Sequence, residues 1–222
     1  MDDQAATIAP APWALMGSGY IIVLKLTRDF VETCGFVPEH LGGSFTGGFG
    51  TVMYVDYSYS DAGPYQELLF IPGMFNLAAA RYFSITKIFV STMDSVVNGL
   101  RNWGIPKELA GFTCEKKGPS TDRIRILKDD TTAAELTVRS YPLRIPVTTG
   151  LVPRSWRTLA HVHEGKTYLT TPMARGTISP ARLIDFSSNG SFFPDISRSC
   201  VMAAFKVPRF FMVFPQARFL SG

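Results

Sequence analysis

The sequence Trp103-Gly104-Ile105-Pro106-Lys107 ends a stretch of helical pattern and holds one lysine in an apolar loop. Before it, apolar residues recur at the i, i+3, i+4, i+7 spacing of one helix face, namely at Met93, Val96, Val97 and Leu100. Gly104 suits the left-handed conformation that ends many helices, and Pro106 cannot continue a helix because it lacks an N–H. The pattern predicts a helix that begins near Met93 and places Lys107 at a defined point just after its end.

The composition is that of a globular protein with a large apolar core. Of the 222 residues 18% are charged and 13% are aromatic, and 17 are Phe. This length suits one well-buried domain, so we expect residues 1–222 to form a single domain. The basic residues are scattered along the sequence and the net charge is +4, which disfavours nucleic acid as a partner.

The cysteines and the chain start bear on location. Cys34, Cys114 and Cys200 are far apart and form no C-x-x-C pair, which is typical of thiols in a reducing compartment. No apolar run approaches the roughly 18 residues needed to cross a bilayer. Asp2 and Asp3 stand where a secretory signal would begin with basic residues. We therefore expect a cytoplasmic protein with no membrane partner.

Most of the remaining pattern predicts strands. Residues 49–59 and 65–71 are separated by turn residues and predict a hairpin. A short helix is expected after Thr27. Further strands are expected at residues 20–26, 82–90, 112–116, 123–128, 133–140, 155–162, 168–173, 177–186 and 200–214. Many short strands with few helices favour a β-dominated α+β fold that is closed or sandwiched.

Glu67 lies on the second strand of this hairpin. The two-residue period of a strand places it on the same face as Tyr65, Leu69 and Ile71. Burying an ionised carboxylate without a partner costs several kcal/mol. Glu67 therefore has a partner or takes part in proton transfer, unless its strand lies at a sheet edge where the side chain reaches solvent.

Lys107 is the candidate nucleophile. At neutral pH a lysine of ordinary pKa is protonated, and its ammonium group is not a nucleophile. Burial near Trp103, Ile105, Leu109 and Phe112 would lower the pKa of Lys107 and supply the uncharged amine that Schiff-base chemistry requires. The alternative interpretation is a surface lysine in a proline-containing loop.

Three other sequence features do not support a functional site. The glycine-rich segment 42–48 lacks the Gly-Lys-Ser/Thr ending of a phosphate-binding loop and predicts a flexible turn. His161 and His163 share one face of a predicted strand, but the sequence shows no third metal ligand, so we expect no metal. A G-x-S-x-G nucleophile motif does not occur in the sequence, which disfavours serine hydrolase chemistry.

Two segments resemble a known family. Residues 103–107 resemble the W-G-[FY]-P-K signature of the acetoacetate decarboxylase family, whose lysine forms a Schiff base with the substrate. Gly63-Pro64-Tyr65-Gln66-Glu67 is similar to the family's G-x-Y-x-E segment, whose glutamate lines the active site. The segments 12–20 and from Val207 onward are similar in spacing to its first and last strands. The resemblance implies a cone-shaped closed β-barrel with peripheral strands and a few helices, assembled into a homo-oligomer.

The resemblance also implies roles for particular residues and no cofactor. The catalytic residues would be Lys107 and Glu67, and the substrate-binding residues Tyr20, Tyr65, Trp103 and Glu108. Two positions depart from the family's decarboxylases. Glu108 stands where they have a second lysine, and Ser18 stands where an arginine holds the substrate carboxylate. Candidates to replace that arginine are Arg28, Arg81 and Arg101.

Together these features predict a cofactor-free lyase that acts through a lysine Schiff base. Its substrate would be a keto acid or a hydrophobic carbonyl compound, and its reaction a decarboxylation, or an aldol, dehydration or cyclisation step of secondary metabolism. Another hypothesis is a protein that binds or cyclises a hydrophobic small molecule without covalent chemistry at Lys107. A third is a metal-dependent enzyme that uses His161 and His163.

Overall fold

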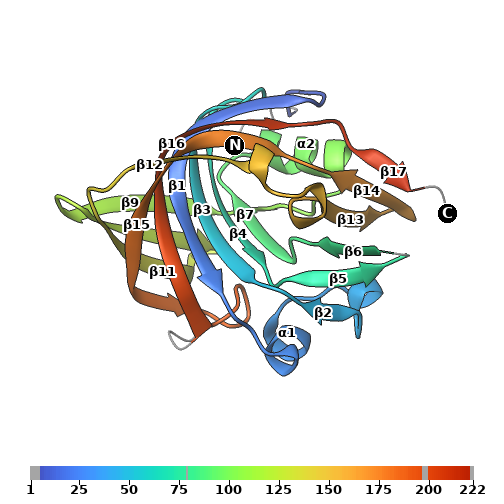
Figure 1. Ribbon diagram of the computed structural model, residues 1–222, viewed down its shortest axis with the longest axis horizontal. Coiled ribbons are helices and arrows are strands. Elements are labelled where there is room, and N and C mark those ends of the chain that lie inside the picture. The colour runs from blue at the N-terminus through green and yellow to red at the C-terminus, as the bar shows by residue number, and fades with distance from the viewer. Residues whose placement is uncertain (1–5, 79, 197–199, 221–222) are drawn as a thin grey trace.

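The computed structural model describes residues 6–78, 80–196 and 200–220, which form mostly strands (Figure 1). Within these ranges there are two α-helices, α1 (Arg28–Cys34) and α2 (Met93–Trp103), and the 3-10 helices η1 (Glu39–Leu41), η2 (Thr149–Leu151) and η3 (Arg154–Trp156). None of the helices described is long and apolar enough to cross a membrane. The expected β-dominated fold is confirmed.

The larger sheet curls into a nearly closed barrel. Its strand order is β8-β7-β4-β3-β1-β16-β15-β11-β10-β9, and β12 also pairs with β15. All of these pairs are antiparallel except β7 with β8. The strands are β1 (Trp13–Leu24), β3 (Gly50–Tyr59), β4 (Tyr65–Ile71), β7 (Lys87–Val90), β8 (Glu108–Leu109), β9 (Gly111–Gly118), β10 (Thr121–Lys128), β11 (Thr131–Ser140), β12 (Ile145–Thr148), β15 (Met173–Ser188) and β16 (Val201–Phe214).

A smaller sheet lies beside the barrel, at the right in Figure 1. Its order is β17-β14-β13-β6-β5-β2. The strands are β2 (Phe45–Gly47), β5 (Met74–Leu77), β6 (Ala80–Phe83), β13 (Leu159–His163), β14 (Lys166–Thr170) and β17 (Arg218–Leu220).

Alternate side chains of the hairpin β3–β4 serve two separate cores. Tyr54 and Leu68 pack in one cluster with residues of β10 and β11, inside the barrel. Tyr57 and Leu69 point to the other side of the sheet and pack in a second cluster with Trp103 of α2. The predicted hairpin and its two-residue period are confirmed, and Glu67 lies on the second side.

Two predicted strands differ in the structure. The expected strand at 82–90 is two strands, because β6 belongs to the smaller sheet and β7 to the barrel. The buried residues Ser84 and Ile85 carry the chain between the two sheets. The expected strand at 155–162 begins only at Leu159, because η3 occupies the residues before it. Both changes occur where the chain passes between layers, which a local pattern does not reveal.

Helix α2 begins and ends as predicted, but its buried face is different. Gly104 has φ 64°, which is the left-handed conformation expected at the end of the helix. The residues of α2 that the fold buries are Ser95, Asn98, Gly99 and Trp103. Asn98 is buried because its Oδ1 accepts a hydrogen bond from the backbone N of Ala9 at 2.8 Å. The segment before β1 thus packs on α2 and helps to turn its polar face inward.

Candidate active site

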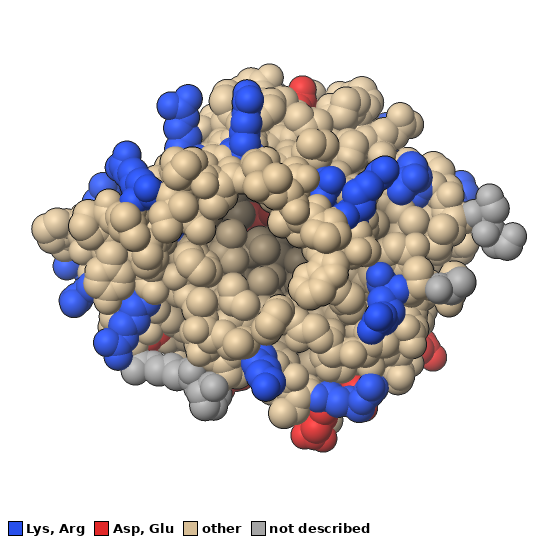
Figure 2. Space-filling model, viewed as in Figure 1, with Lys and Arg blue, Asp and Glu red and all other residues tan. Residues whose placement is uncertain are grey.

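A cavity of about 770 Å³ lies between the barrel sheet, the smaller sheet and α2. Its lining is mostly apolar and aromatic, and the charged residues in it are Glu67, Lys107, Arg157 and Arg175. The face shown in Figure 2 is hollowed at this place, and acidic atoms are visible deep in the hollow. Glu67 is the acidic residue of the lining and is 4% exposed, so its end of the cavity is buried.

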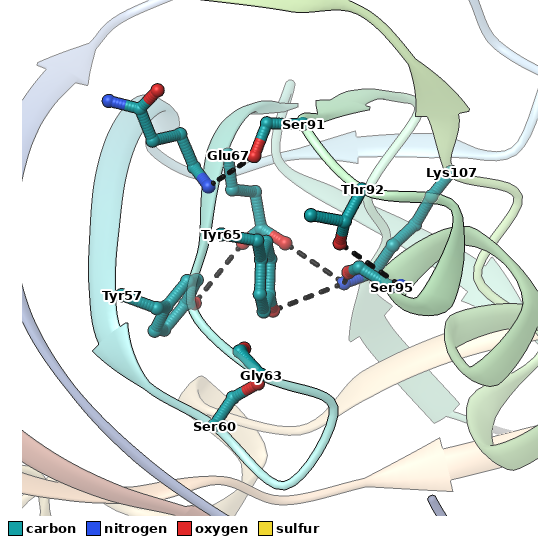
Figure 3. A network of polar contacts seen from close by, with 10 residues as sticks. Tyr57, Ser60, Gly63, Tyr65, Glu67, Ser91, Thr92, Ser95 and Lys107 are labelled. Atoms are coloured by element: carbon teal, nitrogen blue, oxygen red, sulfur yellow. Dashed lines mark hydrogen bonds and ion pairs between the residues drawn. The ribbon is translucent and has the colours of Figure 1, made fainter. Parts of the chain in front are cut away.

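Lys107 reaches this cavity with its amine held by three oxygen atoms (Figure 3). Lys107 Nζ donates to Glu67 Oε2 at 3.0 Å, to Ser95 Oγ at 3.0 Å and to the Tyr65 hydroxyl at 3.4 Å. Its side chain is 5% exposed. The alternative of a surface lysine is wrong, because the loop after α2 turns Lys107 inward.

Helix α2 shapes the space for the Lys107 side chain. A Cβ added to Gly99 would come within 2.7 Å of Lys107 Cε and 2.8 Å of Cδ. Such contacts are too close for carbon atoms, so only glycine leaves room for the lysine stem at this position. One turn earlier, Ser95 presents its hydroxyl to the amine. The small buried face of α2 therefore positions Lys107.

Both carboxylate oxygens of Glu67 are hydrogen-bonded. Oε2 accepts from Lys107, and Oε1 accepts from the Tyr57 hydroxyl at 3.2 Å. Strand β4 lies between β3 and β7, so Glu67 is not at a sheet edge. The expectation of a partner for this buried carboxylate is confirmed, and the partner is Lys107.

The electrostatics of the pair correct one expectation from the sequence. Burial lowers the pKa of Lys107, but the carboxylate of Glu67 and the hydroxyl of Tyr65 outweigh it, so the pKa is raised above its ordinary value. Burial and Glu67 also raise the pKa of Tyr65 to about 12. Lys107 is therefore an ammonium ion in the resting site, and burial alone does not supply a neutral amine.

The other expected site residues are divided between the cavity and its surroundings. Trp103 lines the cavity and donates from Nε1 to Pro215 O at 2.7 Å. Tyr20 borders the cavity, but its hydroxyl donates to Asp122 Oδ2 at 2.6 Å and its ring packs inside the barrel. Glu108 is not part of the lining, and its Oε1 accepts from Lys87 Nζ at 2.5 Å. The structure brings Lys107, Glu67, Tyr65 and Trp103 to one cavity.

Ser95 and Gly99 were not expected from the sequence as residues of the site. They lie eight and four residues before Trp103, and this spacing places all three on one face of the helix. None of Arg28, Arg81 and Arg101 lines the cavity, whereas Arg157 and Arg175 do. Arg157 Nε donates to Val152 O at 3.2 Å and Nη1 donates to Pro172 O at 3.0 Å. No local motif marks these two arginines.

The histidine pair does not assemble with further ligands. His161 is buried, and its Nε2 accepts a hydrogen bond from Ile85 N at 3.2 Å. Burial lowers the pKa of His161 to about 3. In the described part of the chain, no three His, Cys, Asp or Glu side chains are grouped so that they could hold a metal ion.

No protein-family model matches the sequence. A comparison with curated proteins finds no match either. Solved structures do match. Acetoacetate decarboxylase from Legionella pneumophila has a TM-score of 0.69 at 11% identity, over 100% of this chain and 92% of that one. The chain has the acetoacetate decarboxylase-like fold. The resemblance seen around Lys107 is confirmed at the level of the fold.

Two further structures share this acetoacetate decarboxylase-like fold. An acetoacetate decarboxylase-like enzyme from Sphingomonas wittichii has a TM-score of 0.68 at 11% identity, over 100% of this chain and 97% of that one. The enduracididine biosynthesis enzyme MppR, complexed with the condensation product of pyruvate and imidazole 4-carboxaldehyde, has a TM-score of 0.66 at 13% identity, over 99% of this chain and 92% of that one. These three structures are of enzymes.

Proposed function

We propose that the protein is a cofactor-free enzyme that makes or breaks carbon–carbon bonds through a Schiff base on Lys107. The observation that carries the proposal is the contact of 3.0 Å between Lys107 Nζ and Glu67 Oε2 at the wall of an apolar cavity. A buried amine beside a carboxylate has a base within reach that can take its proton. The apolar lining suits a hydrophobic carbonyl compound as the substrate.

The first step makes the amine nucleophilic. A carbonyl compound that enters the cavity displaces water, and the proton of the Lys107 ammonium moves to Glu67, which leaves both groups neutral. Lys107 Nζ then attacks the carbonyl carbon to give a carbinolamine. The carbinolamine hydroxyl leaves as water with the proton that Glu67 holds, and the product is a protonated imine beside a carboxylate.

The protonated imine is an electron sink. If the substrate is a β-keto acid, the electrons of the breaking carbon–carbon bond move to the imine nitrogen, CO2 leaves and an enamine remains. The enamine can also attack an aldehyde, which forms a carbon–carbon bond. Acetoacetate decarboxylase and the MppR condensation complex share this fold and support the two branches respectively. Arg157 and Arg175 would hold a carboxylate of the substrate.

Reductive trapping tests the proposal. The protein is incubated with a panel of β-keto acids, α-keto acids and aldehydes in the presence of sodium borohydride, and the modified peptide is identified by mass spectrometry. We expect a covalent adduct on Lys107 and none there in Lys107→Arg, which keeps the charge. Binding of each compound is measured in parallel by thermal shift. The mechanism would be overturned if compounds of the panel bind the protein but none of them forms an adduct on Lys107.

A second candidate is a protein that binds a hydrophobic ligand without covalent chemistry. The raised pKa of Lys107 favours it, because three hydrogen bonds hold the amine as an ammonium ion. In that case Lys107→Arg would keep the ligand affinity and any turnover of the wild-type protein. Loss of turnover with retained binding would reject this candidate.

A further inference from the structure

The rim of the cavity exposes a group of large apolar side chains. Residues that line the cavity and are also solvent-exposed lie at its opening. Among them, Trp156 is 56% exposed. Leu151, next to the lining residue Val152, is 87% exposed at the end of η2. We call the exposed apolar lining residues, together with Leu151, the mouth rim: Phe49, Val147, Leu151, Val152 and Trp156.

The charge around the mouth rim is positive. Residues 136–222 contain eleven Lys and Arg but three Asp and Glu, whereas residues 1–135 contain eleven and fifteen. Between Glu135 and Glu164 the sequence has no acidic residue, and this segment includes β12, η2 and η3. Figure 2 shows the hollow bordered by uncharged atoms with Lys and Arg around them, and with acidic atoms mainly at the edge of the view.

Apolar side chains surrounded by arginines suit a surface that is apolar inside and anionic outside. Trp residues favour the interface between lipid headgroups and acyl chains, and Arg residues near it are attracted to anionic headgroups. A protruding leucine adds apolar area that can be buried in the acyl region. A contact of the mouth rim with the same rim of a second copy would place the arginines beside it, such as Arg154 and Arg157, near those of the other copy, and this juxtaposition of like charges is unfavourable.

We infer that the mouth rim docks on an anionic membrane surface, so that a hydrophobic substrate passes from the bilayer into the cavity. The mouth rim leads directly into the apolar lining, and a ligand that fills the cavity is poorly soluble in water. This surface contact needs no membrane-spanning segment. It therefore differs from the expectation of no membrane partner, which rested on the absence of such a segment from the sequence. It does not depend on chemistry at Lys107.

The chain contains a built-in probe for this inference. Trp13 and Trp103 are buried, and Trp156 is the exposed tryptophan of the three. The full chain is mixed with vesicles of equal parts phosphatidylcholine and phosphatidylglycerol, with or without bromine on the acyl chains. We expect co-sedimentation with these vesicles, weak binding to pure phosphatidylcholine, and release in 1 M salt, where the Debye length falls to about 3 Å. Brominated lipid should quench tryptophan emission, and Trp156→Phe should abolish the quenching.

A pair of variants separates docking from a general loss of folding. Leu151→Asp should weaken vesicle binding by roughly tenfold. It removes an apolar group that inserts into the bilayer, and the new carboxylate is repelled by the anionic headgroups. Met93→Asp is the matched control, since Met93 is 51% exposed on α2 and outside the mouth rim. It should bind as the wild type does, and so should Lys107→Arg. Thermal unfolding is measured for each variant to confirm that it is folded.

Three outcomes would overturn the inference. The first is no partition into anionic vesicles at low salt. The second is partition that Leu151→Asp and Met93→Asp reduce equally, which would mean that another surface binds. The third is an oligomer in gel filtration that Leu151→Asp dissociates while vesicle binding is absent, which would assign the mouth rim to a second copy of this chain.

Discussion

Gly99 and Lys107 fit against each other, because the missing side chain of one leaves the space for the side chain of the other. A methyl group on Gly99 would lie 2.7 Å from Lys107 Cε and 3.2 Å from Cγ. Gly99 is on the buried face of α2, four residues after Ser95, which hydrogen-bonds the amine. The helix therefore sets both the path of the lysine stem and the position of its charged end.

Gly99→Ala should displace the amine with little loss of stability. Alanine is favoured over glycine inside a helix by about 0.5–1 kcal/mol, which offsets part of the strain. A shift of the reacting atom by about 1 Å can reduce a rate by about a hundredfold. We expect borohydride trapping at Lys107 to slow by between about ten- and a hundredfold. Arg101→Ala, at an exposed position of the same helix, is the control. Unchanged trapping in Gly99→Ala would show that Lys107 finds another productive position.

Glu67→Gln should reverse the way stability depends on pH. In the wild type the pKa of Lys107 is raised above 10.5, so its contribution to stability is present below that pH and is lost as the pH rises further. In the variant, burial is left as the largest influence and lowers the pKa of Lys107. The unfolded chain then binds more protons than the folded one below pH 10.5, so the free energy of unfolding rises with pH toward that value.

The measurement is chemical denaturation between pH 7 and pH 11. At pH 7 we expect Glu67→Gln to lose about 3–5 kcal/mol, because an ammonium ion remains buried without its carboxylate. Glu32→Gln, which removes an exposed carboxylate, controls for the change in net charge. Parallel pH profiles for the wild type and Glu67→Gln would contradict the proposed charge state of the pair.

Local pattern predicted the parts of the site that lie on regular elements. The alternation in β4 placed Glu67 beside Tyr65, and the stop at Gly104 placed Lys107 after α2. The charge state was not predictable, because the pKa of Lys107 depends on a contact with a residue 40 positions earlier in the chain. The hydrogen bonds of Glu108 with Lys87 and of the Tyr20 hydroxyl with Asp122 likewise join residues that are distant in the sequence.

The buried face of α2 was also not predictable from local pattern. Its apolar spacing indicated Met93, Val96, Val97 and Leu100 as one face, yet Met93 is exposed in the structure. Asn98 is buried because the segment before β1 supplies its hydrogen-bond partners, and Gly99 because Lys107 packs on it. The spacing of apolar residues predicts which hydrophobic side chains are buried. It does not predict burial of a polar side chain whose hydrogen-bond partners come from a distant segment.

Arg157→Gln should weaken the binding of carbonyl compounds that carry a carboxylate. Two backbone carbonyls hold its guanidinium at the cavity, with further N–H groups available to an anion. A hydrogen bond to a charged group contributes about 1.5–3 kcal/mol, so we expect KM to rise at least about tenfold. For the matching neutral methyl ester KM should not change. Arg209→Gln, an exposed arginine outside the lining, is the control. Equal effects on acid and ester would contradict the anion contact.

His161 should make the protein sensitive to mild acid. Burial lowers its pKa to about 3, and its neutral Nε2 accepts a hydrogen bond from Ile85 N. The folded state then binds fewer protons than the unfolded state between this value and 6.5, so the contribution of His161 is complete above pH 6.5 and is lost as the pH falls. The expected loss is about 1.4 kcal/mol per pH unit in that window. His161→Gln offers an uncharged acceptor in a similar place and should remove this part of the slope, as measured by urea denaturation at pH 7 and pH 5. An unchanged slope in the variant would show that other groups cause the acid sensitivity.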